Sequence, residues 1–245
     1  MKTCNFSLSI IVPMYNEERR VGTTFIALER FIAAYSFRAV EIIFVDDGST
    51  DATAMRLASF YPNCPRRLVT YTPNRGKGYA VKQGMLAAAH DYALMLDADI
   101  STSMESFEAF IPHLLQGVPV VIGSRKAATA NVVKAQAWHR QKLGELFAVL
   151  ARLVTGVKSI DFSCGFKCFS RQAIKNLFSR ALIERWSCDV EILYLAAHSG
   201  LHIQEVGVTW KDDEHTKFNL QRDAWQSLVD LIRIPWLHRK WINRT

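Results

Sequence analysis

Two carboxylates, Asp97 and Asp99, follow an apolar run over residues 92–96 and are separated by a single residue. A buried strand ending at this point would deliver both side chains to the rim of a sheet. Mg²⁺ typically binds one or two protein carboxylates together with substrate phosphates and waters, and a cation held there can neutralise a departing diphosphate. The pair therefore indicates metal-assisted chemistry on a nucleotide diphosphate, with a solvated turn as the alternative.

A second acidic segment, residues 46–51 (Asp-Asp-Gly-Ser-Thr-Asp), follows the apolar run 40–45. A turn that leads into a helix, capped by Ser49 or Thr50, would account for the glycine and one hydroxyl. It would not account for two carboxylates directly after a buried strand. Carboxylates at a strand tip can accept hydrogen bonds from ribose hydroxyls, as an acidic residue does in dinucleotide sites.

Residues 74–78 (Asn-Arg-Gly-Lys-Gly) are basic and glycine-rich and precede a helical pattern. Backbone amides at a helix N-terminus attract phosphate, and Lys77 would add a cation beside them. The segment is not a Walker loop, because the Gly-x-x-x-x-Gly-Lys-Ser/Thr spacing is missing. It is not a Rossmann fingerprint either, because Val81 stands where the third glycine would fall.

In the first half of the chain, apolar strand-like runs alternate with helical patterns. The strand-like runs are 8–12, 40–45, 68–71, 92–96 and 118–123. The helical patterns are 17–34, 51–60, 79–90 and 104–115, and we expect Pro112 to kink or end the last of these. The alternation predicts an α/β fold with a mostly parallel sheet and helices on both faces. Ligands of such sheets bind at the carboxyl ends of the strands, where the polar clusters fall.

After Arg125 this alternation stops. The remaining patterns predict one long helix at 133–155, a loop and short strand at 159–170, a helix at 188–198, a strand at 202–210 and a helix at 223–234. No linker, repeat or low-complexity tract divides the chain. We therefore predict one domain over residues 1–235, followed by a basic, aromatic tail over residues 236–245.

The chain has 245 residues, is 49% hydrophobic and carries a formal net charge of +7. A basic balance suits nucleic acid, anionic lipid or phosphorylated substrates, but the chain shows no nucleic-acid-binding motif. No apolar stretch approaches the roughly 20 residues needed to span a bilayer, and the N-terminus lacks the layout of a signal peptide. Five cysteines without a second ligand pair at zinc-like spacing favour free thiols in a reducing cytosol. We therefore expect a cytoplasmic protein that binds phosphate and lipid.

The stretch 228–245 combines aliphatic residues with Trp236 and Trp241. From Arg233 onward it contains four basic residues and no acidic one. An amphipathic segment of this kind fits peripheral binding to a membrane surface. The alternative is a terminal helix packed on the core, followed by a basic tail.

Taken together, these segments resemble the inverting family-two glycosyltransferases of the GT-A fold, over about residues 7–236. The family markers are 12–18 (Val-Pro-Met-Tyr-Asn-Glu-Glu), 45–51 (Val-Asp-Asp-Gly-Ser-Thr-Asp) and 97–99 (Asp-Ala-Asp). The second half is similar to the polyprenyl-phosphate group of this family, and above all to its dolichyl-phosphate β-glucosyltransferases. The segments that carry this likeness are 138–140, 161–167, 184–191 and 208–210.

The resemblance implies roles for the matching residues. Those expected to bind the nucleotide-sugar donor are Pro13, Tyr15, Asn16, Glu17, Asp46, Asp47, Gly76, Lys77, Asp97, Ala98 and Asp99. Asp97 and Asp99 would also hold Mg²⁺ or Mn²⁺. Those expected to bind the acceptor phosphate are Arg125, Arg140, Lys167 and Lys217. The residues expected to act in catalysis are Asp97, Asp99, Arg125, Asp161 and Asp189, and either of the last two could orient the acceptor or stabilise positive charge on the sugar.

The implied reaction moves a hexose, glucose from UDP-glucose, onto a polyprenyl or dolichyl monophosphate. A GDP-mannose-dependent mannose synthase and a non-catalytic nucleotide-sugar-binding scaffold are the alternatives. Ser101 stands where mannose synthases often carry Gln, which leaves a third metal ligand open. Of the Gly-Ser-Lys motif expected late in the chain, only Lys217 is matched. A processive synthase is disfavoured because Leu182 replaces the Gln of its Gln-x-x-Arg-Trp motif.

Overall fold

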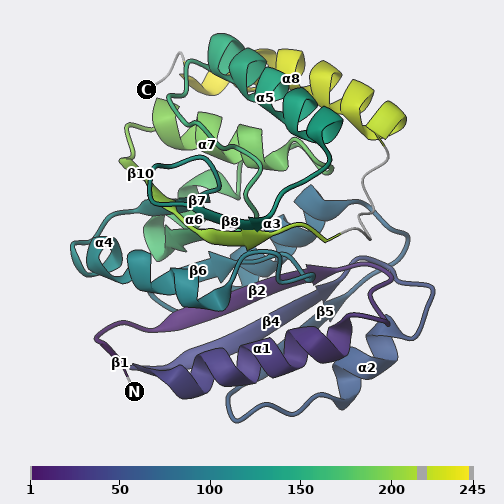
Figure 1. The fold of residues 1–245 in the computed structure, drawn as a ribbon, viewed down its shortest axis with the longest axis vertical. Coiled ribbons are helices and arrows are strands. Elements are labelled where there is room, and N and C mark those ends of the chain that lie inside the picture. The colour runs from purple at the N-terminus through teal and green to yellow at the C-terminus, as the bar shows by residue number, and fades with distance from the viewer. Residues whose placement is uncertain (1, 214–219, 243–245) are drawn as a thin grey trace.

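The computed structural model describes residues 2–213 and 220–242, and its centre is a seven-stranded sheet (Figure 1). From one edge to the other its strands are β10 (Ile203–Gly207), β7 (Val120–Ser124), β9 (Lys167–Ser170), β6 (Tyr92–Met95), β2 (Leu8–Met14), β4 (Val40–Asp46) and β5 (Arg66–Thr70). Only β9, among these seven, runs antiparallel to its neighbours. The predicted mostly parallel sheet is confirmed.

Helices cover both faces of this sheet. They are α1 (Val21–Ala34), α2 (Thr53–Ser59), α3 (Lys77–Ala87), α4 (Ile111–Leu115), α5 (Trp138–Thr155), α6 (Arg171–Leu177), α7 (Cys188–His198) and α8 (Leu220–Ile242), with a 3₁₀ helix, η1 (Met104–Ala109), before α4. Two short parallel pairs lie outside the main sheet, β1 (Lys2–Cys4) with β3 (Tyr35–Phe37) and β8 (Asn131–Lys134) with β11 (Thr209–Lys211).

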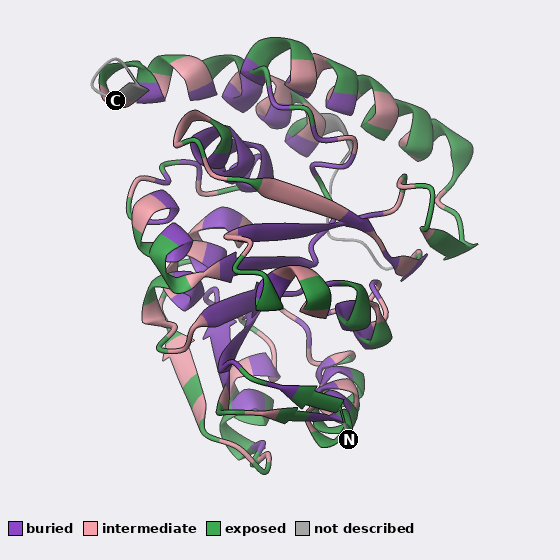
Figure 2. Ribbon diagram, turned by 90° about the vertical axis from the view of Figure 1, so that its left-hand side faces the viewer, coloured by how far each residue is buried: buried purple, intermediate pink, exposed green. Residues whose placement is uncertain are grey.

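The strands divide their side chains between two hydrophobic cores. Along β2, Ile10 and Val12 pack in the core beneath α1, α2 and η1, whereas Ile11 packs in the core beneath α3, α6 and α7. This alternation follows from the two-residue period of a strand, and it explains why the strands read as continuous apolar runs. Figure 2 shows the central strands buried and the outer surfaces of the top helices exposed.

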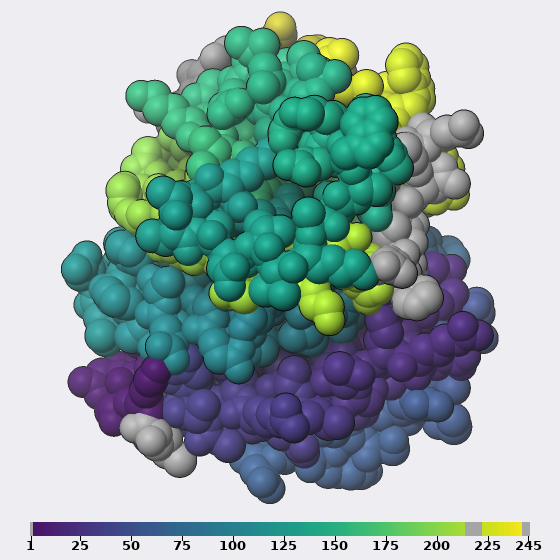
Figure 3. All heavy atoms as spheres, in the orientation of Figure 1, coloured from purple at the N-terminus to yellow at the C-terminus, as the bar shows by residue number. Residues whose placement is uncertain are grey.

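Helices α5 and α8 form an outer layer at one end of the molecule. They contact each other, and α8 also packs on α7. Figures 1 and 3 show both helices at the end opposite α1 and α2. The inner side of α8 contributes Leu231 and Ile234 to the core.

Four predicted elements differ in the structure. The long helix expected at 133–155 begins at Trp138, because residues 131–134 form β8 beside β11. The helix expected at 104–115 is divided into η1 and α4, and Pro112 stands in the first turn of α4, where a proline loses no hydrogen bond. The strand expected at 202–210 is divided into β10 and β11.

The fourth difference lies at the C-terminal end of the described chain. The helix predicted at 223–234 extends through Pro235 as α8, so residues 236–242 continue it. The sequence pattern also missed α6, whose N-cap Ser170 accepts a hydrogen bond from the Ala173 N–H. The division of the chain at residue 235 stays a prediction.

Candidate active site

A cavity of about 530 Å³ opens at the carboxyl ends of β2, β4, β6 and β7, and parts of α5 and α8 form its opposite wall. Parallel strands bring their carboxyl ends to one edge, and this volume suits a small-molecule ligand. The predicted site residues that line it are Pro13, Tyr15, Glu17, Asp47, Gly76, Lys77, Asp97, Ala98, Asp99, Arg125, Arg140 and Asp189. Asn16, Asp46, Asp161 and Lys167 are described but are not among its lining residues.

Lys77, one of the lining residues, bridges two carboxylates. Its Nζ lies 2.7 Å from Asp97 Oδ1 and 3.8 Å from Asp189 Oδ2. Burial lowers the pKa of Lys77, but Asp97 and Asp189 outweigh it and hold that pKa above its ordinary value. Burial likewise opposes ionisation of Asp97, yet Lys77, with Lys167 and Arg125, keeps the pKa of Asp97 below its ordinary value. The structure therefore holds Lys77 charged against an ionised Asp97.

Asp99 completes the acidic pair. Its Oδ1 accepts a hydrogen bond from the backbone N–H of Ser101 at 2.9 Å. Burial and the nearby negative charge of Asp97 raise the pKa of Asp99, as expected for two like charges in a confined space. A cation between the two carboxylates would relieve this repulsion.

These two carboxylates fit a divalent metal ion whose remaining ligands come from the substrate. Within residues 2–213 and 220–242, no group of three or more His, Cys, Asp or Glu side chains could hold a metal by itself. Mg²⁺ and its relatives need no such cage where phosphates and waters supply the remaining ligands. Asp97 and Asp99, which both line the cavity, would hold the ion.

Gly165 permits the close approach of the next loop to Asp97. A Cβ atom placed on Gly165 would lie 2.0 Å from Asp97 Oδ2. Any larger residue would therefore displace the carboxylate. This explains the glycine at position 165, in the segment 161–167, which the sequence pattern identifies only as a loop.

Arg125, which lines the cavity, forms an ion pair with Asp161, which is buried and does not line it. Arg125 donates from Nε and from its terminal nitrogen to the two Asp161 oxygens, each at 2.7 Å, and its backbone N–H donates at 2.9 Å. Burial opposes ionisation of Asp161, but these donors lower its pKa to about 2. The guanidinium also lies 5.3 Å from the ring centre of Trp210. Asp161 thus orients Arg125, which lines the cavity.

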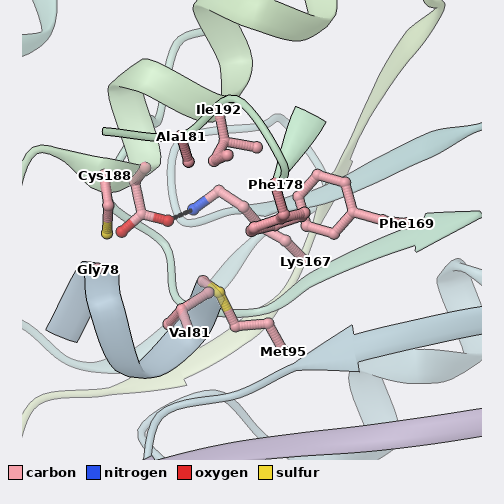
Figure 4. A pocket seen from close by; sticks show the side chains of 10 residues that line it. Gly78, Val81, Met95, Lys167, Phe169, Phe178, Ala181, Cys188 and Ile192 are labelled. Atoms are coloured by element: carbon pink, nitrogen blue, oxygen red, sulfur yellow. Dashed lines mark hydrogen bonds and ion pairs between the residues drawn. The ribbon is translucent and has the colours of Figure 1, made fainter. Parts of the chain in front are cut away.

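Lys167 serves Asp189 in a similar way. Its Nζ donates to Asp189 Oδ1 at 2.5 Å and to the carbonyl oxygens of Phe162 and Cys164 at 3.0 and 2.5 Å. The side chain is 1% exposed and borders a separate small cavity of about 10 Å³ (Figure 4). The geometry therefore favours a role for Lys167 in positioning Asp189, and phosphate binding by Lys167 stays a prediction.

The loops after β2, β4 and β5 are joined by polar side chains of the predicted site. Asp47 accepts hydrogen bonds from Asn74 Nδ2 at 2.6 Å and from the backbone N–H groups of Arg75 and Gly76 at 2.8 Å each. Asp47 therefore fixes the segment that carries Lys77.

Asn16 makes the corresponding link between the loops after β2 and β4, whereas Asp46 holds the turn that directly follows β4. Asn16 Oδ1 accepts from the Thr50 N–H at 2.8 Å, and Asp46 Oδ1 accepts from the Ser49 N–H at 3.3 Å. Asn16 and Asp46 therefore shape the donor side of the site from behind the residues that line it.

Several site residues were missed by sequence reasoning. Arg20 binds Glu17 at 2.7 Å and Asp213 at 2.6 Å, and all three line the cavity. Glu17 and Arg20 are three residues apart at a helix start, which is a weak local signal. Asp213 gives none, because its partner is far away in the sequence.

The wall formed by α5 and α8 is mostly apolar. Its apolar members are Leu143, Leu146, Phe147, Leu150 and Leu228. Arg140 lines the cavity from the first turn of α5, as do Arg185 and Trp186 from the loop before α7. Lys217 lies outside the described residues. One cavity thus joins an acidic and basic floor to an apolar wall.

Comparisons with known proteins agree with this geometry. The family model described as Glycosyl transferase family 2 matches residues 9–178. A dolichyl-phosphate β-glucosyltransferase from Dictyostelium discoideum is 36% identical over 94% of this chain and 74% of its own length. The protein of that name from Homo sapiens is 34% identical over 86% of this chain and 69% of its own length.

Solved structures with a similar backbone identify the fold. Mannosyl-3-phosphoglycerate synthase from Rubrobacter xylanophilus superposes with a TM-score of 0.70 at 16% identity, covering 98% of this chain and 76% of that one. Glucosyl-3-phosphoglycerate synthase from Mycobacterium tuberculosis, solved with Mn²⁺, UDP and glucosyl-3-phosphoglycerate, gives 0.65 at 19% identity over 94% and 80%. The predicted GT-A fold is confirmed, and the chain belongs to glycosyltransferase family 2.

Proposed function

We propose that the chain is a hexosyltransferase that moves glucose from UDP-glucose to the phosphate of a polyprenyl lipid of the dolichyl type. The names of its relatives support this assignment. The observation that carries it is the composition of the cavity. Acidic Asp97 and Asp99 stand beside basic Lys77 and Arg125 at one end, and the apolar wall of α5 stands at the other. A charged donor and a lipid phosphate need these two surfaces in one site.

On the donor side, Asp97 and Asp99 would hold Mg²⁺ or Mn²⁺, which when bound neutralises the diphosphate as it leaves. Lys77 lies beside Asp97, where its ammonium can contact the same phosphates. The loops after β2 and β4 would surround the nucleoside, with Pro13, Tyr15 and Asp47 at the cavity wall. Preorganised charges of this kind stabilise a leaving group without reorganisation during the reaction.

In the reaction itself, an oxygen of the lipid phosphate attacks the anomeric carbon of glucose. The new carbon–oxygen bond forms on the face opposite the nucleotide, and the bond to the diphosphate breaks with its electron pair going to UDP. The product has the inverted configuration. Because a phosphate monoester is mostly dianionic at pH 7, it needs no base to remove a proton, and the protein contributes orientation and charge.

Of the two carboxylates left open by the sequence, Asp189 is better placed to act on the sugar or acceptor. It lines the cavity and is held between Lys77 and Lys167. Asp161 is held by Arg125 behind the wall. We therefore assign Asp189 to the substrates and Asp161 to the orientation of Arg125.

The acceptor phosphate would approach between Arg125 and Arg140, with its first isoprene units against α5. Both arginines line the cavity, as do Leu143 and Leu146. Arginine suits phosphate because its planar guanidinium can donate two parallel hydrogen bonds. Lys217 remains a predicted contributor from outside the described residues.

We further propose that the protein docks on a membrane through α5 and α8. In the described part of the chain, no helix combines the length and apolarity needed to cross a bilayer. Both helices nevertheless expose large apolar side chains, namely Trp138, Leu146, Leu153, Trp225, Ile232 and Trp236. Basic side chains alternate with them on α8, including the half-exposed Arg233. All five cysteines are free, which supports docking on the cytoplasmic face.

The assignment is tested with purified protein, a panel of radiolabelled nucleotide sugars and a short-chain prenyl phosphate, with and without EDTA. We expect transfer from UDP-glucose, loss of transfer in EDTA, and recovery with Mg²⁺ or Mn²⁺. Asp97→Asn should remain folded and inactive. Transfer from GDP-mannose alone would replace the proposed donor. A folded protein that binds UDP but transfers from no donor would overturn the enzymatic assignment.

A further inference from the structure

The α7 residue Glu191 is fully buried and accepts three hydrogen bonds outside its own helix ladder. Its side chain is 0% exposed. It receives the backbone N–H groups of Leu182 and Ile183 at 2.8 and 3.0 Å. The third donor is Nε2 of His238 on α8, 2.8 Å away. One carboxylate therefore ties the loop before α7 to the outermost helix.

That loop continues into the floor of the cavity. A Cβ atom placed on Gly78 would lie 2.4 Å from the Ile183 carbonyl oxygen, and one placed on Gly76 would lie 2.6 Å from the Glu184 carbonyl oxygen. The Glu184 carbonyl also accepts the Tyr79 N–H at 3.0 Å. The residue between the two glycines is Lys77. The backbone of this loop thus sets the position of Lys77.

The same loop is tied to α8 a second time. The Ser187 hydroxyl donates to the Ser227 carbonyl oxygen of α8 at 3.3 Å. His238 is 4% exposed, so its contact with Glu191 is shielded from water and geometrically fixed. A shift of α8 would move the carboxylate that holds residues 182 and 183.

We propose that Glu191 and His238 are positioning residues that transmit the position of α8 to the donor site. The path runs from His238 through Glu191 and the backbone of Leu182 and Ile183 to Lys77. It is physically contiguous, with a hydrogen bond or van der Waals contact at every step. The inference rests on the proposed donor site, and α8 is the helix that we propose to meet the membrane.

Two variants separate the hydrogen bond from simple packing. His238→Gln keeps an N–H donor near the position of Nε2, whereas His238→Phe keeps a ring without a donor. We expect His238→Phe to weaken binding of UDP with Mn²⁺ by about fivefold and to raise the KM for UDP-glucose in the same proportion. His238→Gln should bind as the wild type does. His198→Phe is the matched control, because the hydrogen bond of His198 is made within its own helix, with the Tyr194 carbonyl oxygen.

Titration calorimetry with UDP and Mn²⁺ gives the result without an acceptor lipid. Unchanged affinity in His238→Phe, or an equal loss in His238→Gln, overturns the relay. A wild type that binds no UDP would instead reject the proposed donor site.

Hydrogen exchange in the wild type supplies a readout that needs no variant. UDP with Mn²⁺ should slow exchange at residues 182–183 and around residue 238 together. Protection confined to the loops after β2, β4 and β6 would also overturn the proposal.

Discussion

The ammonium of Lys77 lies 2.7 Å from Asp97 Oδ1, on the carboxylate that we assign to the divalent cation. In the absence of metal, Lys77 therefore balances part of the charge that a metal would balance. Binding of the metal and diphosphate requires Asp97 to exchange this partner. The same ammonium is then free to turn to the diphosphate. Lys77 thus competes with a free metal ion for Asp97, but it assists the reaction by stabilising the departing diphosphate.

Lys77→Met should separate these two effects. Without the competing ammonium, we expect Mn²⁺ to bind the nucleotide-free protein at least about fivefold more tightly. Turnover should nevertheless fall about a hundredfold, because a charged donor to the leaving group is lost. Electron paramagnetic resonance measures free Mn²⁺, and the transfer assay measures turnover.

The control for this experiment is Lys175→Met. Lys175 is an exposed lysine on α6 and is not among the residues that line the cavity. Its substitution should change neither quantity. If the Mn²⁺ affinity of Lys77→Met were unchanged or lower, the prediction that Lys77 competes with the metal for Asp97 would be wrong.

Gly165→Ala should inactivate the protein without unfolding it. The new methyl group would meet Asp97 within 2.0 Å, so the carboxylate must rotate away. Misplacing a catalytic group by about 1 Å costs roughly a hundredfold in rate. Gly22→Ala is the control, since nothing lies within 4 Å of a Cβ there and the residue is helical. Transfer rates and thermal midpoints check the prediction, and a fully active Gly165→Ala would contradict the placement of Asp97.

The strand ends could be predicted because their signal is local. Asp97 and Asp99 follow a buried apolar run, and any parallel sheet must carry them to its binding edge. The segment that contains Lys77 could be placed beside them for the same reason. The local pattern could not show which charged side chains pair with one another. Arg20 and Asp213 meet only through the tertiary fold.

Lys167 shows a second limit of the sequence. The family resemblance implied that Lys167 binds a phosphate, and what the sequence could not show is that β9 buries this lysine and places its Nζ 2.5 Å from Asp189. Burial of a lysine costs energy unless it is paired, and the partner lies 22 residues further along the chain. The choice between Asp161 and Asp189 was open for the same reason, because each role depends on which carboxylate faces the cavity.

The Arg125–Asp161 pair predicts a specific acid sensitivity. Asp161 has a pKa of about 2 in the folded chain against an ordinary value of 3.8. A depressed folded pKa stabilises the fold above pH 4, and this contribution is lost as the pH falls through 2. The difference corresponds to about 2 kcal/mol. Urea unfolding between pH 5 and pH 2 should therefore show a steeper loss for the wild type than for Asp161→Asn. Parallel curves would contradict the pairing.

Membrane docking through α5 and α8 is best tested by single charges on exposed apolar positions. Deleting residues 236–245 would also remove the buried His238, so a deletion cannot separate docking from the internal contact. Trp236 on α8 and Leu153 on α5 are 70% and 76% exposed, and Trp236→Glu or Leu153→Glu should leave the fold intact. Each should lower binding to anionic liposomes by about tenfold or more, given the roughly 1.5–3 kcal/mol from burying a large apolar side chain.

Met55→Glu is the matched control for these variants. Met55 is 69% exposed but lies on α2, at the opposite end of the molecule (Figure 1). Co-sedimentation measures binding, and turnover with a short, water-soluble prenyl phosphate measures the active site separately. We expect Trp236→Glu and Leu153→Glu to retain that turnover while losing activity on a long-chain acceptor in vesicles. Equal liposome binding by all three variants and the wild type would exclude α5 and α8 as the docking surface.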